Sequence, residues 1–243
     1  MRVLRQAFPI AIMLALPTLR HPLWHFTLSI IPASYFLIFT LMGGPELGRQ
    51  ALLGALVVFA VNAGIVSLPQ LIVGLRYRRM QEMFVASPIG PVPYALGTAI
   101  SRLLYVLPLI VLVLALLVLT GLPMGKLPPI LAVLFVTWLI GSMLGFTVAT
   151  YVRNPMHISA VSNLLGLLLT LIPPVYYPLS LVPKSVQWLA LLVPTTNAAQ
   201  LVRIYVGAVR VKAGSLALSW AVLGAYAALF LLLVATRARW DEP

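Results

Sequence analysis

The stretch RYRRMQEMFVASPIGPVPYALGTAISR, residues 76–102, lies between two long apolar runs. It holds four of the sixteen basic residues of the chain, and it also holds Glu82, one of only four acidic residues. A charged insert between apolar runs is where a membrane protein meets water and soluble partners. The stretch is therefore interpreted as a loop that joins two membrane spans.

A short amphipathic helix is predicted near the start of this loop. Met80, Met83 and Phe84 recur at helical spacing, which gives the helix one apolar side. Pro88 ends the helix, because proline lacks an N–H and disfavours helical geometry in the residue before it. Two interpretations remain open: an ordinary basic loop that only sets orientation, or a surface helix that receives a soluble partner.

Charge pairing supports the same helix. Glu82 follows Arg78 by four residues and Arg79 by three. Pairs at these spacings stabilise a helix by about 0.2–0.5 kcal/mol. The spacing therefore predicts that the three side chains belong to one continuous helix.

Composition limits the class of protein. Of the 243 residues, 62% are hydrophobic and 8% are charged, whereas soluble proteins carry roughly 25% charged residues. The net charge of +12 does not indicate nucleic-acid binding, since the basic residues lie at span boundaries and no reader motif is present. Because cysteine is absent, disulfides and thiolate metal sites are excluded.

The apolar runs predict an all-α polytopic membrane protein with a single transmembrane domain, residues 1–243. Six spans are expected, at residues 24–42, 51–75, 101–120, 130–152, 158–172 and 216–236. A polar turn is expected at 43–50 between the first two. Gly141 and Gly145 in the fourth span have a spacing that lets two helix backbones approach closely.

The N-terminal region, residues 1–22, is too short in its apolar core to span a membrane. Arg2 and Arg5 precede the core, and no convincing cleavage site follows it, which argues against a signal peptide. The region is expected to be a helix lying in the cytoplasmic interface, where its basic end meets anionic headgroups.

The longest connection, residues 173–212, is apolar but interrupted by prolines. Two short helices are expected in it, at 186–192 and about 197–209, and neither is long enough to span about 30 Å of hydrocarbon. The segment is expected to dip into the outer leaflet and return, shielded by protein.

The distribution of arginine predicts orientation. With both termini in the cytoplasm, the inner side holds ten of the sixteen basic residues, and the two short outer turns hold only Arg49 and Lys126. The ten are Arg2, Arg5, Arg20, Arg76, Arg78, Arg79, Arg102, Arg153, Arg237 and Arg239.

Catalytic and ion-coupling chemistry is missing from the sequence. No acid falls inside a predicted span, which argues against a proton- or sodium-coupled carrier. No H-E-x-x-H zinc motif, nucleophile motif or P-loop is present, so neither an enzyme nor bound ATP is expected in this chain. Asn62, Gln70 and Asn163 are either polar glue between helices or the lining of a transport path.

The whole pattern resembles the membrane permease of type-2 ATP-binding-cassette (ABC) exporters. The loop motif of that family has arginines, then a glutamate, then Ser-Pro; here these are Arg78, Arg79, Glu82, Ser87 and Pro88. The segment PPVYYPLSLVPKSVQWLALLVPTTNAAQLVR, residues 173–203, resembles the outer segment of the family. Tyr176 and Tyr177 stand where small residues or phenylalanine are frequent.

The resemblance implies a division of labour between subunits. Residues 76–94 would be the coupling loop that docks on a separate P-loop ATPase, which binds ATP and Mg, and a second permease subunit, identical or different, would complete the path in the plasma membrane. The docking residues would be Arg78, Arg79, Met80, Glu82, Met83, Phe84 and Pro88. The outer gate would include Pro174, Tyr176, Tyr177, Pro178, Pro183 and Pro194. An ATP-independent channel or carrier, or an intramembrane enzyme, is the alternative.

Overall fold

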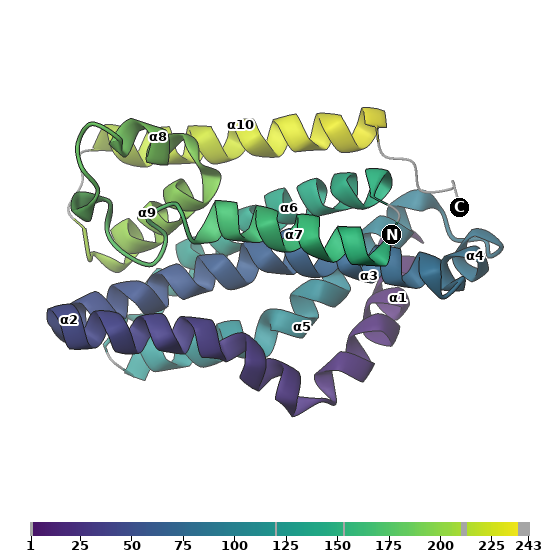
Figure 1. The fold of residues 1–243 in the computed structure, drawn as a ribbon, viewed down its shortest axis with the longest axis horizontal. Helices are drawn as coiled ribbons and strands as arrows, with labels where there is room; N and C mark the ends of the chain where they lie inside the picture. The colour runs from purple at the N-terminus through teal and green to yellow at the C-terminus, as the bar shows by residue number, and fades with distance from the viewer. Residues whose placement is uncertain (1, 120, 153, 210–212, 238–243) are drawn as a thin grey trace.

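The computed structural model describes residues 2–119, 121–152, 154–209 and 213–237. Arg153 and Arg239, for which a cytoplasmic position is predicted, and positions 210–212 of the outer segment lie outside the described residues. The regular elements of the described ranges are all helical, as predicted, and the long helices run roughly along one axis (Figure 1). Four stretches among them are long and apolar enough to cross a membrane: Pro32–Tyr77, Pro91–Leu119, Met124–Tyr151 and Ser215–Thr236.

The first of these stretches is a bent hairpin rather than one rod. It comprises most of α2 (Pro22–Asn62), a π-helical turn η1 (Ala63–Ser67) and α3 (Leu68–Tyr77). A straight helix of its 46 residues would be about 69 Å long, roughly twice a bilayer core. Gly44, with a φ of 78°, breaks the helical geometry of α2. Gly48 packs tightly on Thr40, since a Cβ at position 48 would lie 1.9 Å from the Oγ1 of Thr40. The polar turn predicted at 43–50 is therefore a single non-helical glycine.

One local prediction about the 76–102 stretch is wrong. The ion-pair spacing placed Arg78, Arg79 and Glu82 on one helix, but α3 ends at Tyr77 and α4 (Met80–Val85) begins after Arg79, whose φ of 57° is left-handed. The third long helix, α5 (Pro91–Leu119), begins ten residues before the predicted span at 101. Proline suits a helix start because its missing N–H has no partner to lose there.

The centre of the bundle is the second half of α2 with η1 and α3. In the most apolar window of this stretch 78% of the residues are buried, against 11% in α10 (Ala213–Arg237). The central stretch packs against α5, α6 (Leu127–Tyr151) and α7 (Pro155–Thr170). α10 packs on α6 and leaves most of its apolar surface exposed, as suits a helix surrounded by lipid.

Backbone contact joins the central stretch to α6. A Cβ on Gly64 would lie 2.2 Å from the backbone nitrogen of Ser142, and one on Gly145 would lie 2.1 Å from the carbonyl oxygen of Gly64. A Cβ on Gly141 would meet the carbonyl oxygen of Val61 at 2.6 Å. The close approach predicted for Gly141 and Gly145 is confirmed, with Gly64 as its partner in η1.

The N-terminal helix α1 (Arg2–Leu19) lies against α5. Its buried side chains recur at helical spacing: Ala7, Ile10, Ala11, Leu14 and Ala15. Gly97 of α5 allows this approach, since a Cβ there would lie 2.9 Å from the carbonyl oxygen of Ala7. Arg102, predicted at a cytoplasmic edge, is buried, and its Nη2 donates to the carbonyl of Leu14 over 3.1 Å.

The remaining short elements gather at one end of the molecule. They are η2 (Met124–Lys126), η3 (Leu179–Leu181), α8 (Gln187–Leu192) and α9 (Pro194–Val206). α8 and α9 lie at the same end of the molecule as the bend of α2, and α4 lies at the opposite end (Figure 1). The two short helices predicted in the 173–212 segment are therefore present, and α7, with 16 residues or about 24 Å, is shorter than a full crossing.

Candidate functional site

Arg76 fastens the 76–94 segment to the body of the protein. Its Nε donates to Oε1 of Gln81 over 2.9 Å, and its Nη1 donates to the carbonyl of Ala149 over 2.5 Å. Ala149 is in the last turn of α6, where carbonyls lack partners within the helix and a cation is favoured by the helix dipole. One side chain thus joins the end of α3, the start of α4 and the end of α6.

The apolar side of α4 faces the protein. Met80 and Phe84 pack against the cluster of Ile10, Leu14 and Leu75, and the Phe84 ring lies 5.5 Å from that of Tyr94. These two predicted docking residues therefore brace α4 against α1 and α5. Met83, in contrast, is 72% exposed.

The exposed surface of the segment is polar at one end and apolar in the middle. Five of the predicted docking residues are exposed to solvent along the connection from α3 through α4 to α5: Arg78, Arg79, Glu82, Met83 and Pro88. Val85 is also exposed, at 43%. A partner protein would meet one flexible methionine, one valine and charges of both signs.

The outer segment is packed onto the spans rather than solvated. The predicted gate residues Pro174, Tyr176, Pro178 and Pro194 are buried, Tyr177 is half-buried and Pro183 is exposed. The Tyr176 ring stacks on Tyr35 of α2 with centroids 4.2 Å apart. The backbone of Val175 crosses α2 at Gly54, where a Cβ would lie 2.2 Å from the Val175 carbonyl oxygen.

Polar side chains tie α8 and α9 to the long helices. Nζ of Lys126 donates to the carbonyl of Val206 over 2.9 Å, at the C-terminal end of α9. Nε1 of Trp220 in α10 donates to the hydroxyl of Tyr205 over 2.9 Å, and the hydroxyl of Tyr226 donates to the carbonyl of Leu192 over 3.0 Å. The outer segment is therefore held at several points by spans on different sides of it.

Arg203 is a buried cation that was not recognised in the sequence. It is 1% exposed, and its guanidinium donates to the carbonyls of Pro174 and Val175. Burial lowers the pKa of Arg203 to about 10, so the side chain stays protonated at neutral pH. A signal was available: Arg203 is the only charged residue in α9.

The polar residues predicted to line a path do not form one buried cluster. Asn62 is half-buried with Oδ1 toward α7, 3.2 Å from where a Cβ on Gly166 would lie. That oxygen is buried without a hydrogen bond. Asn163 on α7 is exposed, and Gln70 is half-buried on α3. Of the three, Asn62 at the start of the π-helical turn is the best candidate for lining a path, because its buried oxygen has no hydrogen-bond partner.

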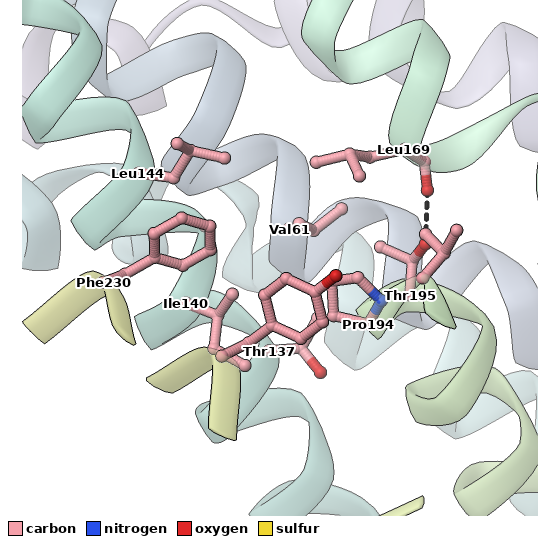
Figure 2. A pocket seen from close by; sticks show the side chains of 11 residues that line it. Val61, Thr137, Ile140, Leu144, Leu169, Pro194, Thr195 and Phe230 are labelled. Carbon is pink, nitrogen blue, oxygen red and sulfur yellow. Dashed lines mark hydrogen bonds between the residues drawn. The ribbon is translucent and has the colours of Figure 1, made fainter. Parts of the chain in front are cut away.

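A cavity of about 110 Å³ lies between α2, α6, α7, α9 and α10 (Figure 2). Its lining is mostly aliphatic and aromatic, including Val61, Ile140, Leu144 and Phe230. The hydroxyl of Thr195 at its edge donates to the carbonyl of Leu169, as the dashed line in Figure 2 marks. The lining of the cavity contains no carboxylate, histidine, lysine, arginine or cysteine, and the described residues include no cluster able to hold a metal ion.

These features define a multi-pass helical membrane protein: apolar helices in close backbone contact, a surface helix at one end and a packed, proline-rich segment at the other. The chain belongs to the ABC-2 type transporter family, whose model matches residues 12–206. It is the membrane subunit of an ABC transporter, and the permease domain of this family has no ATPase activity itself. ABC-2 permeases generally pair with ABC ATPase subunits. A search of curated proteins found no match.

Proposed function

We propose that this chain is one half of the membrane part of an ATP-driven exporter and that a separate ABC ATPase docks on residues 76–94. The observation that carries the proposal is the attachment of α4. An exposed helix that is bonded through Arg76 to α6 and packed through Phe84 against α1 and α5 is positioned to pass a displacement of its partner to three helices. ATP and Mg bind to the partner, and this chain binds neither.

The proposal includes the membrane arrangement. The chain crosses the plasma membrane six times, with the α2 hairpin supplying two crossings and α7 a short one. Both termini are cytoplasmic, and residues 1–22 lie in the inner interface. The outer face of α1, which exposes Leu4, Phe8 and Met13, suits contact with lipid.

The path lies between two permease subunits, identical or different, and Asn62, Gln70 and Asn163 line it. The outer segment, residues 173–212, enters the outer leaflet and returns as a gate. Its buried prolines and the stacked Tyr176 support this, because irregular backbone at membrane depth must be shielded by protein. The resemblance allows drugs, lipids, glycans or ions as the exported substrate.

Orientation is tested by cysteine labelling, since the chain has no native cysteine. In intact cells, a cysteine replacing Lys184 is expected to react with an impermeant thiol reagent, whereas one replacing Arg79 reacts only after the cells are opened. Labelling at position 79 without labelling at position 184 in intact cells would show that the orientation is the opposite of the one proposed.

Docking is tested by co-purification of the permease with a candidate ABC ATPase subunit. Met83→Ala is expected to weaken association by more than about 1 kcal/mol, roughly fivefold, because an exposed methionine is a natural anchor for a groove. Met42→Ala is the matched control, since Met42 is 79% exposed and lies beside Gly44 at the bend of α2, far from α4. Phe84→Ala should instead lower the thermal stability of the permease alone.

The outcomes separate the alternatives. Unchanged co-purification and unchanged ATP hydrolysis in a Glu82→Gln/Met83→Ala variant would mean that the ATPase docks elsewhere. Transport that continues without any ATPase would support the channel or carrier.

A further inference from the structure

A second cavity lies beside α9 in the outer segment. Its volume is about 80 Å³, and it lies among the irregular stretch around η3, the second half of α9 and Val209. Its lining combines polar and apolar side chains: Pro178, Leu179, Ser180, Gln200, Arg203, Ile204 and Val209. A water molecule needs about 10–15 Å³ of such volume, so the cavity has room for a group of several heavy atoms.

Arg203 is one of the lining residues, and its guanidinium is incompletely satisfied. Its five N–H donors include two that bind the carbonyls of Pro174 and Val175, whereas Nε is buried and has no partner among the described atoms. Within the described part of the chain, no acidic side chain pairs with Arg203. A buried charge normally requires such a partner, because carbonyl dipoles compensate it only in part.

The surrounding sequence adds positive charge and no negative charge. Residues 173–212 contain Lys184, Arg203, Arg210 and Lys212 and no aspartate or glutamate. Arg210 and Lys212 lie outside the described residues, one and three positions after Val209 of the cavity lining. The segment thus lacks an internal counter-ion for the buried guanidinium.

We propose that this cavity binds a phosphate-sized oxyanion, with Arg203 as its charged anchor. The amide of Gln200 and the hydroxyl of Ser180 supply neutral donors at the same cavity. Arginine is suited to this task because its planar guanidinium bonds phosphate oxygens with charge-assisted hydrogen bonds. The oxyanion is either free in solution or the phosphate of a phospholipid headgroup at the outer surface.

The site is independent of the ATPase docking surface, which lies at the other end of the molecule, so each proposal can fail without the other. The test uses the purified full chain carrying Ser180→Cys, delipidated in maltoside micelles with chloride as the only small anion. The probes are inorganic phosphate and phosphatidylglycerol, each added alone. Occupancy at ten times the dissociation constant should slow alkylation of the introduced thiol by a neutral maleimide about tenfold.

A matched control and a second variant make the result specific. Leu181→Cys reports a neighbouring side chain that is 58% exposed and outside the cavity lining, and its labelling rate should not change. Gln200→Glu, added to the Ser180→Cys chain, supplies a carboxylate beside Arg203 while leaving that buried residue intact. It should therefore abolish the protection of the thiol at position 180.

Slowing by inorganic phosphate identifies a free oxyanion as the ligand, and slowing by phosphatidylglycerol alone identifies a lipid headgroup. Unchanged labelling of the Ser180→Cys chain with both probes would overturn the proposal. Equal protection in the presence of Gln200→Glu would overturn it as well.

Discussion

Gly64→Ala is expected to lower the free energy of unfolding by about 2–3 kcal/mol, because the added methyl carbon would lie 2.2 Å from the backbone nitrogen of Ser142. The backbone cannot rotate away as a flexible side chain can, so η1 and α6 must move apart to accommodate the methyl group. The expected fall in the unfolding midpoint is about 5–10 °C. Thermal unfolding in detergent, followed by gel filtration of the surviving monodisperse protein, measures it.

Gly224→Ala is the matched control for the same change. Gly224 lies in α10 with no atom within 4 Å of its Cβ position, so the substitution should change stability by no more than about 1 kcal/mol. A Gly64→Ala/Gly145→Ala double variant should cost less than the sum of its parts, since one separation of the helices relieves both clashes. Equal melting of the Gly64 and Gly224 variants would show that the backbones are not in contact.

Arg76→Met is expected to cost about 2–4 kcal/mol of stability, since it removes charge-assisted hydrogen bonds to Gln81 and to the Ala149 carbonyl. It also removes a cation from the C-terminal end of α6. The larger effect should be functional: substrate-stimulated ATP hydrolysis of the assembled transporter should fall while the ATPase still binds through α4. Stability is measured by thermal unfolding and coupling by the ratio of stimulated to basal ATP hydrolysis.

Arg20→Met removes the same charge from an exposed position outside the proposed docking segment, residues 76–94. It should leave the unfolding midpoint and the coupling ratio unchanged. Arg76→Lys should recover part of both, because lysine keeps the charge but not the forked geometry. If Arg76→Met and Arg20→Met behave alike, the bond from Arg76 to α6 has no role in coupling.

Much of the helical architecture could be predicted because hydrophobic length and proline position are local properties. These properties predict the two short helices near Trp188 and Arg203. The spacing of Gly141 and Gly145, which is also local, predicts the close approach of two helices. Periodicity identified the apolar side of α4 but not what that side contacts. Met80 and Phe84 were predicted to contact a partner, and the structure adds that they pack against α1 and α5.

The buried arginines mark the other limit of sequence reasoning. Arg102 and Arg203 lie at the ends of apolar runs, where arginine is usually solvated. Their burial depends on carbonyls of distant residues, Leu14 for Arg102 and Val175 for Arg203. Such long-range acceptors become apparent only when the helices are assembled. The π-helical turn Ala63–Ser67, which packs against α6, was also not predicted.

Hydrogen bonds near the two ends of α6 join this helix to segments at opposite ends of the molecule. Arg76 holds the carbonyl of Ala149 near its last residue, and Lys126, immediately before its first residue, holds the end of α9. With 25 residues the helix is about 37 Å long, so a rigid tilt of about 5° at one end displaces the other by about 3 Å. In mechanical terms these two hydrogen bonds lie at the ends of a lever whose body packs on η1 and α10. A rigid tilt of α6 would therefore displace the end that Lys126 joins to α9 in proportion to the length of the helix.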